Sequence, residues 1–426
     1  MSDDRKVPEG RLGRLARLAT VGLRTGASMI AGGDALPTAR HAAEVLGTLR
    51  GVAAKVGQMA SYVDGVVPEQ HREAYQVALR GLRAAAPSSS AVEVRALLER
   101  ELGGPREALF AVWDEAPVAS ASIGQVHRAE LHDGREVAVK VQHPGIVTAL
   151  ESDLANAAMV EQLLGIAGGR RLNSKALLDM VKGRFREELD YDLEAKRQRH
   201  FHAVHAGDPT VRIPRVVDER SSARVLTQDF ARGLAFEEAC QAPAALREKW
   251  ARTLWRFVFR GNLVGRMFNA DPHPGNYLFH EDGHITFLDF GCVQEIPEDA
   301  QARAVRAHRA AIARDEDAFR ASMRELLRTR PGALEPLALD FVRRCFEPLF
   351  ASPYRIRRPW AAELVDGVKA MTLVARRLPD DELFTMPPEM LFMNRLQFGF
   401  YSVLARLDVE VDYAAEERRF LDDAGL

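Results

Sequence analysis

The chain of 426 residues is 47% apolar and 28% charged, which is ordinary usage for a folded globular protein and excludes a disordered chain. Its 58 basic and 60 acidic residues leave a formal net charge of −2, so nothing in the overall charge attracts nucleic acid, which is not expected as a partner. Three cysteines without a Cys-x-x-Cys pair argue against a disulfide framework or a structural zinc site, and they favour a reducing, cytoplasmic compartment.

The first predicted segment, residues 1–106, is a helical extension. Between residues 5 and 30 it carries six basic residues and one acidic residue, and a helical wheel gathers apolar side chains opposite the arginines. This face could lie on an anionic membrane surface, or it could be the solvated side of a helix that docks on the protein. No apolar run reaches the roughly 18 residues that a spanning helix needs, so any membrane contact is expected to be peripheral.

A β-hairpin is predicted after the helical extension, which Gly103-Gly104-Pro105 should end. Residues 123–130 and 136–141 form short alternating or apolar runs on either side of His132-Asp133-Gly134, a turn sequence. Two further strands are predicted at residues 215–217 and 223–230.

Long helices are predicted between residues 146 and 206, and three glutamates, Glu187, Glu188 and Glu194, are expected on one of them. A second hairpin is predicted from Tyr277–Phe279 and Ile285–Leu288, which flank a turn containing Asp-Gly. The remainder, to the C-terminus, has mainly helical patterns.

Three features carry the chemistry, and the first is the apolar strand Glu136-Val-Ala-Val-Lys140. A strand-end lysine alone is usually a solvated charge. In kinases, however, a lysine at this place holds the first two phosphates of ATP and is oriented by a glutamate on a helix.

The other two features are Asp271-Pro-His-Pro-Gly-Asn276, with the aspartate and asparagine five positions apart, and Asp289-Phe290-Gly291. This is the spacing and order of a kinase catalytic loop and its metal-binding motif. The predicted hairpin between Asn276 and Asp289 should return the amide oxygen and the carboxylate to the same place. Such oxygen ligands, completed by phosphate oxygens, suit Mg²⁺ bound to ATP.

Over roughly residues 45–410 the chain resembles the UbiB-type atypical kinases, also called the AarF or ABC-one group. The resemblance is carried by five strings of residues: Lys55-Val-Gly-Gln58, Ala119-Ser-Ala-Ser-Ile-Gly-Gln-Val-His127, Val139-Lys140-Val-Gln-His-Pro-Gly145, Glu188-Leu-Asp190-Tyr-Asp-Leu-Glu194 and Ala270-Asp-Pro-His-Pro-Gly-Asn276.

The resemblance implies a role for each matching residue. Lys140 would pair with Glu194, and Glu188 would pair with Lys55, whose helix reaches into the active-site cleft. Asp271 would position or deprotonate the attacking oxygen, while Asn276 and Asp289 would bind Mg²⁺. The expected contacts to the nucleotide come from the alanine-rich loop and the hinge: Ala119, Ala121, Ser122, Gln125, Lys140, Gln228 and Phe230.

The alanine-rich loop has one glycine where ordinary kinases have three, which should stiffen it over the terminal phosphate, and Ala121 is expected to set this limit. Two residues depart from the family pattern: Asn269 stands before the catalytic loop in place of histidine, and Gln228-Asp229 replaces Met-Glu at the hinge. Neither change removes an expected ligand of phosphate or metal.

The predicted fold is therefore a helix-rich α+β, protein-kinase-like fold of two lobes, with the extension at 1–106, an N-lobe at 107–233 and a C-lobe at 234–426. The expected activity is Mg-ATP hydrolysis or phosphoryl transfer to a small molecule, which the resemblance links to isoprenoid-quinone biosynthesis or lipid homeostasis. Expected partners are ATP, phenolic or isoprenoid quinone precursors, an anionic membrane surface at the inner face, and quinone-biosynthesis proteins. A pseudokinase scaffold that only binds nucleotide is the alternative, and a protein kinase is the lesser one.

Overall fold

The computed structural model describes residues 89–120, 123–148, 183, 186–375, 378 and 388–426. Contacts divide the chain into two compact units. In the described part, the first contains Val217–Phe230 and the residues up to Asp192, and the second contains Leu193–Val216 and Ala231–Leu426. The fold is α+β and helix-rich, with a small sheet in the first unit and most of the helices in the second.

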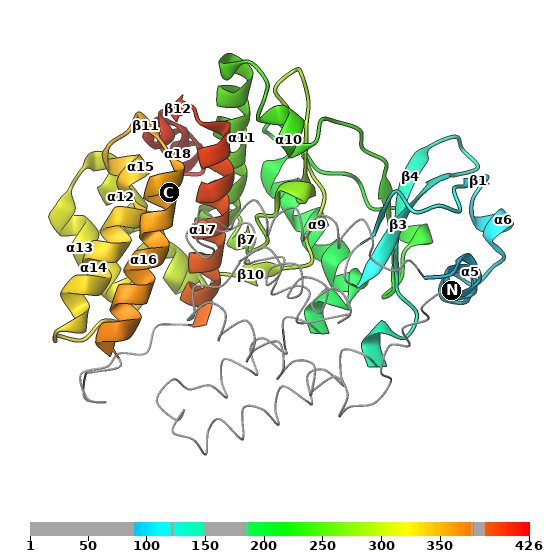
Figure 1. Cartoon of the computed structure of the whole chain (residues 1–426), viewed down its shortest axis with the longest axis horizontal. Coiled ribbons are helices and arrows are strands. Elements are labelled where there is room, and N and C mark those ends of the chain that lie inside the picture. Colours follow the sequence, from blue (N-terminus) through cyan, green and yellow to red (C-terminus); the bar gives the residue numbers. More distant parts are fainter. Residues whose placement is uncertain (1–88, 121–122, 149–182, 184–185, 376–377, 379–387) are drawn as a thin grey trace, which may run out of the picture. The chain divides into compact units, whose positions relative to one another are not determined.

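The sheet of the first unit contains the predicted hairpin, which is confirmed as β3 (Gly124–Glu130) and β4 (Glu136–Gln142) (Figure 1). β1 (Val112–Trp113) and β2 (Ala119–Ser120) pair with β3, and β6 (Val225–Asp229), which lies within the strand predicted at 223–230, pairs with β4. All these pairs are antiparallel. Alternate residues therefore face opposite sides of the sheet.

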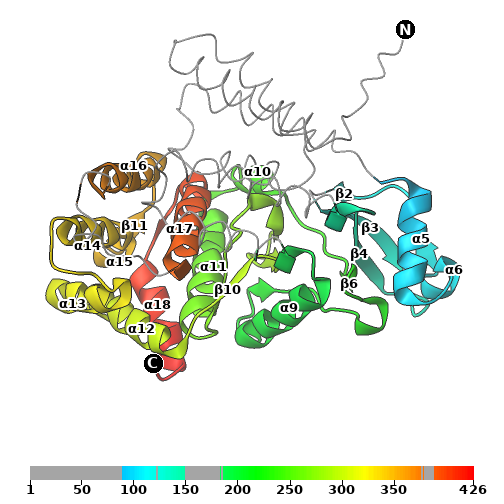
Figure 2. The same cartoon turned by 90° about the horizontal axis from the view of Figure 1, so that it is seen from below.

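One face of this sheet is covered by α5 (Ala91–Leu102) (Figure 2). Ser90 begins the helix with a capping box to Glu93, and Gly103, at φ +73°, ends it as the Gly-Gly-Pro sequence predicts. Val137, Val139 and other apolar residues of the sheet pack with α5 and α6 (Arg106–Leu109) in one buried cluster. The opposite face carries the side chains that alternate with these.

The helix predicted to hold Glu187, Glu188 and Glu194 is not continuous, and that prediction is wrong. A helical turn ends after Glu188, and α9 begins at Tyr191 and runs to His205. Leu189 O accepts a hydrogen bond from Gln142 Nε2 (2.6 Å), and Tyr191 N donates to Ala223 O (3.1 Å). The backbone groups at this point bond to the sheet, which interrupts the helical ladder.

The second unit holds the second predicted hairpin, which is confirmed as β8 (Tyr277–Phe279) and β9 (Ile285–Phe287). The strand predicted at 215–217 is wrong: no strand is assigned to these residues, although Val217 N donates to Thr227 O of β6 at 2.8 Å. β5 (Val211–Arg212), which was not predicted, pairs with β9. Arg212 lies there next to Asp282 of the hairpin turn, at 3.0 Å. β7 (Met267–Asn269) and β10 (Val293–Glu295) form a separate antiparallel pair.

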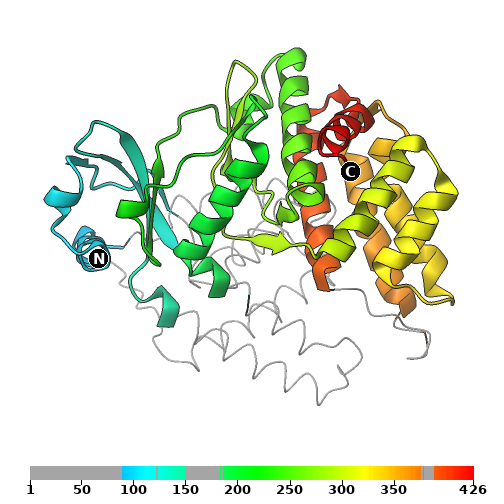
Figure 3. The same cartoon turned by 180° about the vertical axis from the view of Figure 1, so that it is seen from behind.

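Helices make up most of the rest of the second unit, together with the antiparallel pair of β11 and β12, and the yellow and orange helices run beside one another in Figure 3. None of the described helices is both long and apolar enough to cross a membrane. The bounds of the remaining elements are α10 Phe236–Ala239, α11 Ala244–Leu263, α12 Glu298–Ala313, α13 Glu316–Leu327, α14 Leu334–Cys345, α15 Glu347–Phe350, β11 Tyr354–Arg355, α16 Arg358–Ala375, α17 Pro388–Leu407, β12 Glu410–Val411 and α18 Tyr413–Asp423.

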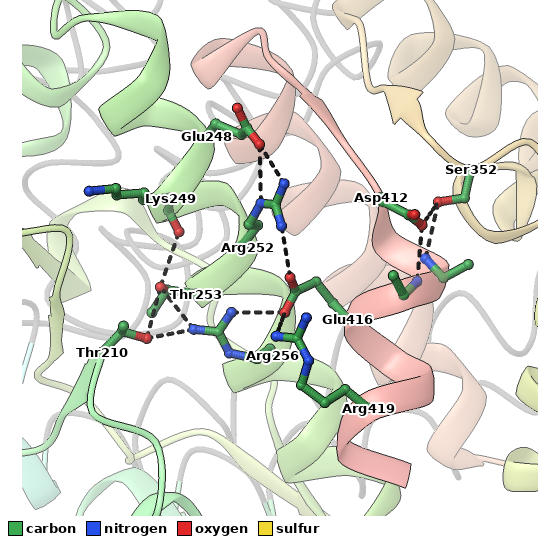
Figure 4. A network of polar contacts seen from close by, with 12 residues as sticks. Thr210, Glu248, Lys249, Arg252, Thr253, Arg256, Ser352, Asp412, Glu416 and Arg419 are labelled. Atoms are coloured by element: carbon green, nitrogen blue, oxygen red, sulfur yellow. Dashed lines mark hydrogen bonds and ion pairs between the residues drawn. The ribbon is translucent and has the colours of Figure 1, made fainter. Parts of the chain in front are cut away.

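A charged network joins α11 to α18 inside this unit (Figure 4). Glu416, which is 1% exposed, lies 3.2 Å from Arg252 and 2.9 Å from Arg256. Arg256 also reaches Asp208, after the end of α9, at 2.8 Å, and Arg252 reaches Glu248 on its own helix. Three segments distant in sequence are thus held by one set of charges.

Candidate functional site

Lys140 lies in the first unit, on the face of the sheet opposite to α5. It is paired across the strands with Val126 and Leu226, and its neighbour on the same face is Ala138. Its ammonium nitrogen lies 4.9 Å from the centre of the Tyr191 ring, a distance at which the ring stabilises the cation. Arg128 and Gln228, which are both paired with Ala138, lie on this face too, so Lys140 stands among apolar and polar side chains.

Other predicted nucleotide ligands share this face or lie beside it. Ala119 is paired with Val126, and Gln228 is paired with Ala138, so both side chains point to the side of Lys140. Phe230 follows β6, and its backbone N–H donates to Glu136 O at 3.0 Å. Ala121 and Ser122 lie outside the described residues.

Gln125 is placed differently, because its side chain points to the covered face of the sheet and is 1% exposed. Its Oε1 accepts from Ser89 N (2.9 Å), and its Nε2 lies 2.8 Å from His127 Nε2. His127 Nδ1 lies 2.9 Å from Asp114 O, a carbonyl that can only accept, so Gln125 Nε2 is the donor to His127. From the covered face of the sheet, the Gln125 side chain bonds to Ser89 and His127. This placement gives no support for a direct contact between Gln125 and nucleotide.

Tyr191 is a residue of this site that the sequence reasoning did not assign. It is fully buried, and a Cβ added to Gly124 would lie 2.7 Å from its hydroxyl and 2.6 Å from Val141 O. The single glycine of the alanine-rich loop is therefore required for this close approach of strand and tyrosine. Tyr191 directly follows Glu188-Leu-Asp190 in one of the family strings, and this position could have identified it from the sequence.

The catalytic-loop candidates, Asp271 and Asn276, meet in the second unit. Asn276 Nδ2 donates to Asp271 O at 3.2 Å, which directs the amide oxygen the other way. Leu288 N donates to Asn276 O at 3.0 Å and so closes the β8–β9 hairpin directly before Asp289. Burial, and secondly the Asp271 charge, raise the pKa of Tyr277, which therefore stays a neutral phenol beneath this loop.

Asn269, the departure from the family pattern, connects the two loops. Its Nδ2 donates to the backbone oxygen of Asp289, and its Oδ1 accepts from Asp271 N at 3.0 Å. One side chain thus fixes the backbone at both predicted acidic residues. The Asp289 carboxylate also accepts from Gly291 N at 2.9 Å.

Helix α9 contacts the Asp-Phe-Gly motif through two charged residues. Glu194 is 2% exposed, and its Oε2 would lie 3.5 Å from a Cβ added to Gly291. Arg197, one turn further along and 4% exposed, donates to Gly291 O at 3.1 Å. Arg197 was not predicted, although its spacing of three residues from Glu194 puts it on the same helix face.

The two predicted lysine–glutamate pairs stay predictions. Lys140 and Glu194 belong to different units. Glu188 is buried at 6% exposure in the first unit, and its predicted partner Lys55 lies outside the described residues.

The oxygen ligands in the second unit fit a metal that arrives with phosphates. Within the described residues there is no cluster of three or more His, Cys, Asp or Glu that could hold a metal ion. Asp289 and Asn276 would supply one carboxylate and one amide oxygen, which is the sparse protein contribution typical of Mg²⁺ bound to a nucleotide. The donor set therefore suits Mg-ATP better than a resident metal.

A cluster of buried aromatic rings begins at Phe290, the residue after Asp289. Phe290, fully buried, lies 5.2 Å from the Phe201 ring of α9, and His205 stacks near Phe201 (6.3 Å) and Phe257 of α11 (5.0 Å). Neither ring nitrogen of His205 has a hydrogen-bond partner among the described residues. Burial lowers the pKa of His205 from its ordinary 6.5 to about 3.

We expect His205 to make the protein less stable in acid. Because the unfolded chain takes up a proton below pH 6.5 and the folded chain does not, this residue should remove about 2 kcal/mol of unfolding free energy between pH 7.5 and pH 5. His205→Leu should abolish that part of the pH dependence. Denaturant unfolding at both pH values measures it. His202→Leu, at an exposed position of the same helix, is the control, and equal pH dependence in wild type and His205→Leu would contradict the expectation.

Comparisons with known proteins agree with the family that the sequence strings resemble. Residues 81–323 match the family described as ABC1 atypical kinase-like domain. The chain is 29% identical over 437 aligned positions to the rat protein "Atypical kinase COQ8B, mitochondrial", covering 96% of this chain and 80% of the relative. It is 30% identical to the zebrafish protein of the same name, over 69% of this chain and 50% of the relative.

A solved structure is also similar: that of Rv3197 from Mycobacterium tuberculosis in complex with erythromycin, with a TM-score of 0.63, 29% identity, and coverage of 88% of this chain and 94% of that one. The fold is thus protein-kinase-like, as predicted. The chain belongs to the ABC1 family of atypical kinase-like proteins, the UbiB group that its sequence strings resemble.

Proposed function

We propose that this protein uses Mg-ATP, either hydrolysing it or transferring its terminal phosphoryl group to a small molecule. The observation that supports this best is the convergence of Asp271, Asn276 and Asp289 on two loops joined by Asn269 and by the bond from Leu288 N to Asn276 O. A module that only binds nucleotide has no need of the aspartate that positions the attacking oxygen.

In the proposed reaction, each residue has one task. Asn276 Oδ1 and the Asp289 carboxylate would hold the metal, and Lys140 with Glu194 would hold the inner phosphates. Asp271 orients the attacking oxygen of water or of a small alcohol or phenol and accepts its proton. Bound Mg²⁺ would neutralise the charge on the phosphates during transfer.

The proposed setting is isoprenoid-quinone biosynthesis or lipid homeostasis, in the cytoplasm at the inner face of a membrane. The resemblance to the UbiB group supports this setting, and the relatives include proteins named as the mitochondrial atypical kinases COQ8B and coq-8. Phenolic or isoprenoid quinone precursors, an anionic lipid surface and quinone-biosynthesis proteins are the proposed partners. The basic face at residues 5–30, through which the chain would meet lipid, lies outside the described residues.

Phosphate release from ATP tests the proposal. Wild type is measured with Mg²⁺ or with EDTA, and with or without anionic vesicles and a soluble phenolic analogue of a quinone precursor. We expect release that requires Mg²⁺ and rises with vesicles and phenol, because the acceptor or its lipid would complete the site. Mass spectrometry of the phenol distinguishes hydrolysis from transfer.

Two results would change the assignment. Turnover that ignores vesicles and phenol would remove the quinone setting and leave the Mg-ATPase. ATP binding, seen as thermal stabilisation, without any phosphate release would favour a nucleotide-binding scaffold.

A further inference from the structure

The C-terminal helix α17 touches the catalytic loop at a glycine. A Cβ added to Gly399 would lie 2.6 Å from Cγ of Pro272 and 3.7 Å from its Cβ and Cδ. A carbon pair at 2.6 Å is well inside the optimal separation of about 3.5–4.0 Å, so one of the two partners would have to move. Pro272 is buried and directly follows Asp271.

Helix α17 is held firmly by the two residues that follow Gly399. Phe400, 1% exposed, packs against the rings of Trp255 and Phe259 on α11, each at 6.1 Å. Tyr401 donates from its hydroxyl to Cys345 O at 2.9 Å and lies 5.1 Å from the Trp360 ring. A methyl group at position 399 would therefore press on Pro272 from a helix that cannot withdraw without breaking these contacts.

Pro272, the other partner in this contact, is the one that would be displaced. Its ring is rigid, so it cannot turn aside as a flexible side chain would. It is bonded to Asp271, whose backbone oxygen accepts from His273 N (2.7 Å) and from Asn276 Nδ2 (3.2 Å). A displacement of Pro272 would therefore pass to both Asp271 and Asn276.

We propose that Gly399 is a positioning residue: its missing side chain lets α17 press on Pro272 and so holds Asp271 and Asn276 in place for the reaction. The catalytic consequence of this contact rests on the proposed function, whereas the contact itself does not. It assigns to the C-terminal helices a mechanical role in catalysis, in addition to completing the core.

Gly399→Ala tests the proposal. We expect kcat for phosphate release to fall about 10- to 100-fold, since a misplacement near 1 Å is enough for a loss of that order. Affinity for ATP without Mg²⁺ should stay within about twofold, because the residues of the first unit are untouched. The clash with Pro272 should lower the melting temperature, since overpacking costs about 1–3 kcal/mol and the helix preference of alanine offsets only part of it. A purely structural glycine would lower stability and leave kcat alone.

The control is Gly367→Ala, which makes the same change in the neighbouring helix α16, where the added methyl would meet the ring of Phe341 at 3.0 Å. It should leave kcat unchanged within about twofold. Pro272→Ala removes the ring atom of the clash, so Gly399→Ala should cost little in that background. A wild-type kcat in Gly399→Ala, or a loss that Pro272→Ala does not relieve, would overturn the proposal.

A measurement without nucleotide separates this proposal from the proposed function. The Asn276 amide donates to His273 O (2.9 Å) and the Leu288 amide to Asn276 O (3.0 Å), so hydrogen exchange at both reports the state of the loop. Faster exchange in Gly399→Ala but not in Gly367→Ala supports the contact even if wild type turns over no ATP. Equal exchange in all three proteins would refute it.

Discussion

Asp271→Asn should abolish phosphate release and leave Mg-ATP binding intact. The amide has the shape of the carboxylate but cannot accept the proton of the attacking oxygen, so we expect a loss of about 10³-fold in kcat. Binding should survive because Asn276 and Asp289 keep their hydrogen bonds to the loop backbone. Phosphate release and nucleotide-dependent thermal stabilisation, measured on one preparation, separate the two effects.

Asp282→Asn is the matched control for this change. It makes the same substitution at an exposed position in the turn of the β8–β9 hairpin, where Asp282 lies near His284 and Arg212. Turnover should stay at the wild-type level. A similar loss in both variants would mean that the hairpin tolerates no change of charge, and full activity in Asp271→Asn would remove Asp271 from the mechanism.

Glu416→Gln should be strongly destabilising. Glu416 is nearly inaccessible and faces two guanidinium groups, those of Arg252 and Arg256. Removal of its charge leaves Arg256, at 16% exposure, with Asp208 and leaves Arg252, at 38% exposure, with Glu248. We therefore expect a loss of about 2 kcal/mol, below the value for a fully buried pair without other partners. The network also includes Asp208, whose carboxylate is buried but has its pKa lowered by Arg256 and Thr210. The shift of the urea midpoint at unchanged slope measures the effect.

Glu248→Gln separates burial from charge, because it makes the same substitution at the open edge of the same network. The Glu248 side chain is 40% exposed, and it contacts Arg252 within one helix. Exposed pairs contribute about 0–1 kcal/mol, so the midpoint should barely move. Equal shifts in the two variants would show that the network is not the buried, charge-dependent structure described here.

Sequence patterns predicted the parts of the fold that depend on local chemistry. Both hairpins were confirmed because Asp-Gly turns and alternating apolar residues act over a few positions. The family assignment was confirmed because it rests on several short strings in a fixed order. The two wrong elements, the strand at 215–217 and the unbroken helix through Glu194, depend on partners far along the chain.

The same reason explains what sequence reasoning missed at the site. Asn269 was noted as a departure from the family, but its bonds to both loops depend on tertiary placement. Gln125 was expected at the nucleotide, and only strand alternation shows that its side chain faces the covered side. Gly399 lies far along the chain from Pro272, and no periodicity relates the two positions.

The most direct test of the central claim is a single-turnover measurement of phosphate release from ATP across a Mg²⁺ titration, with wild type and Asp289→Asn. Mg-ATP use predicts saturable Mg²⁺ dependence in wild type and a loss of about 10³-fold in the variant, since several kcal/mol of charge stabilisation depend on the metal. A wild-type rate in Asp289→Asn would contradict the assignment of Asp289 to the metal. No release by wild type that binds ATP would contradict the use of Mg-ATP.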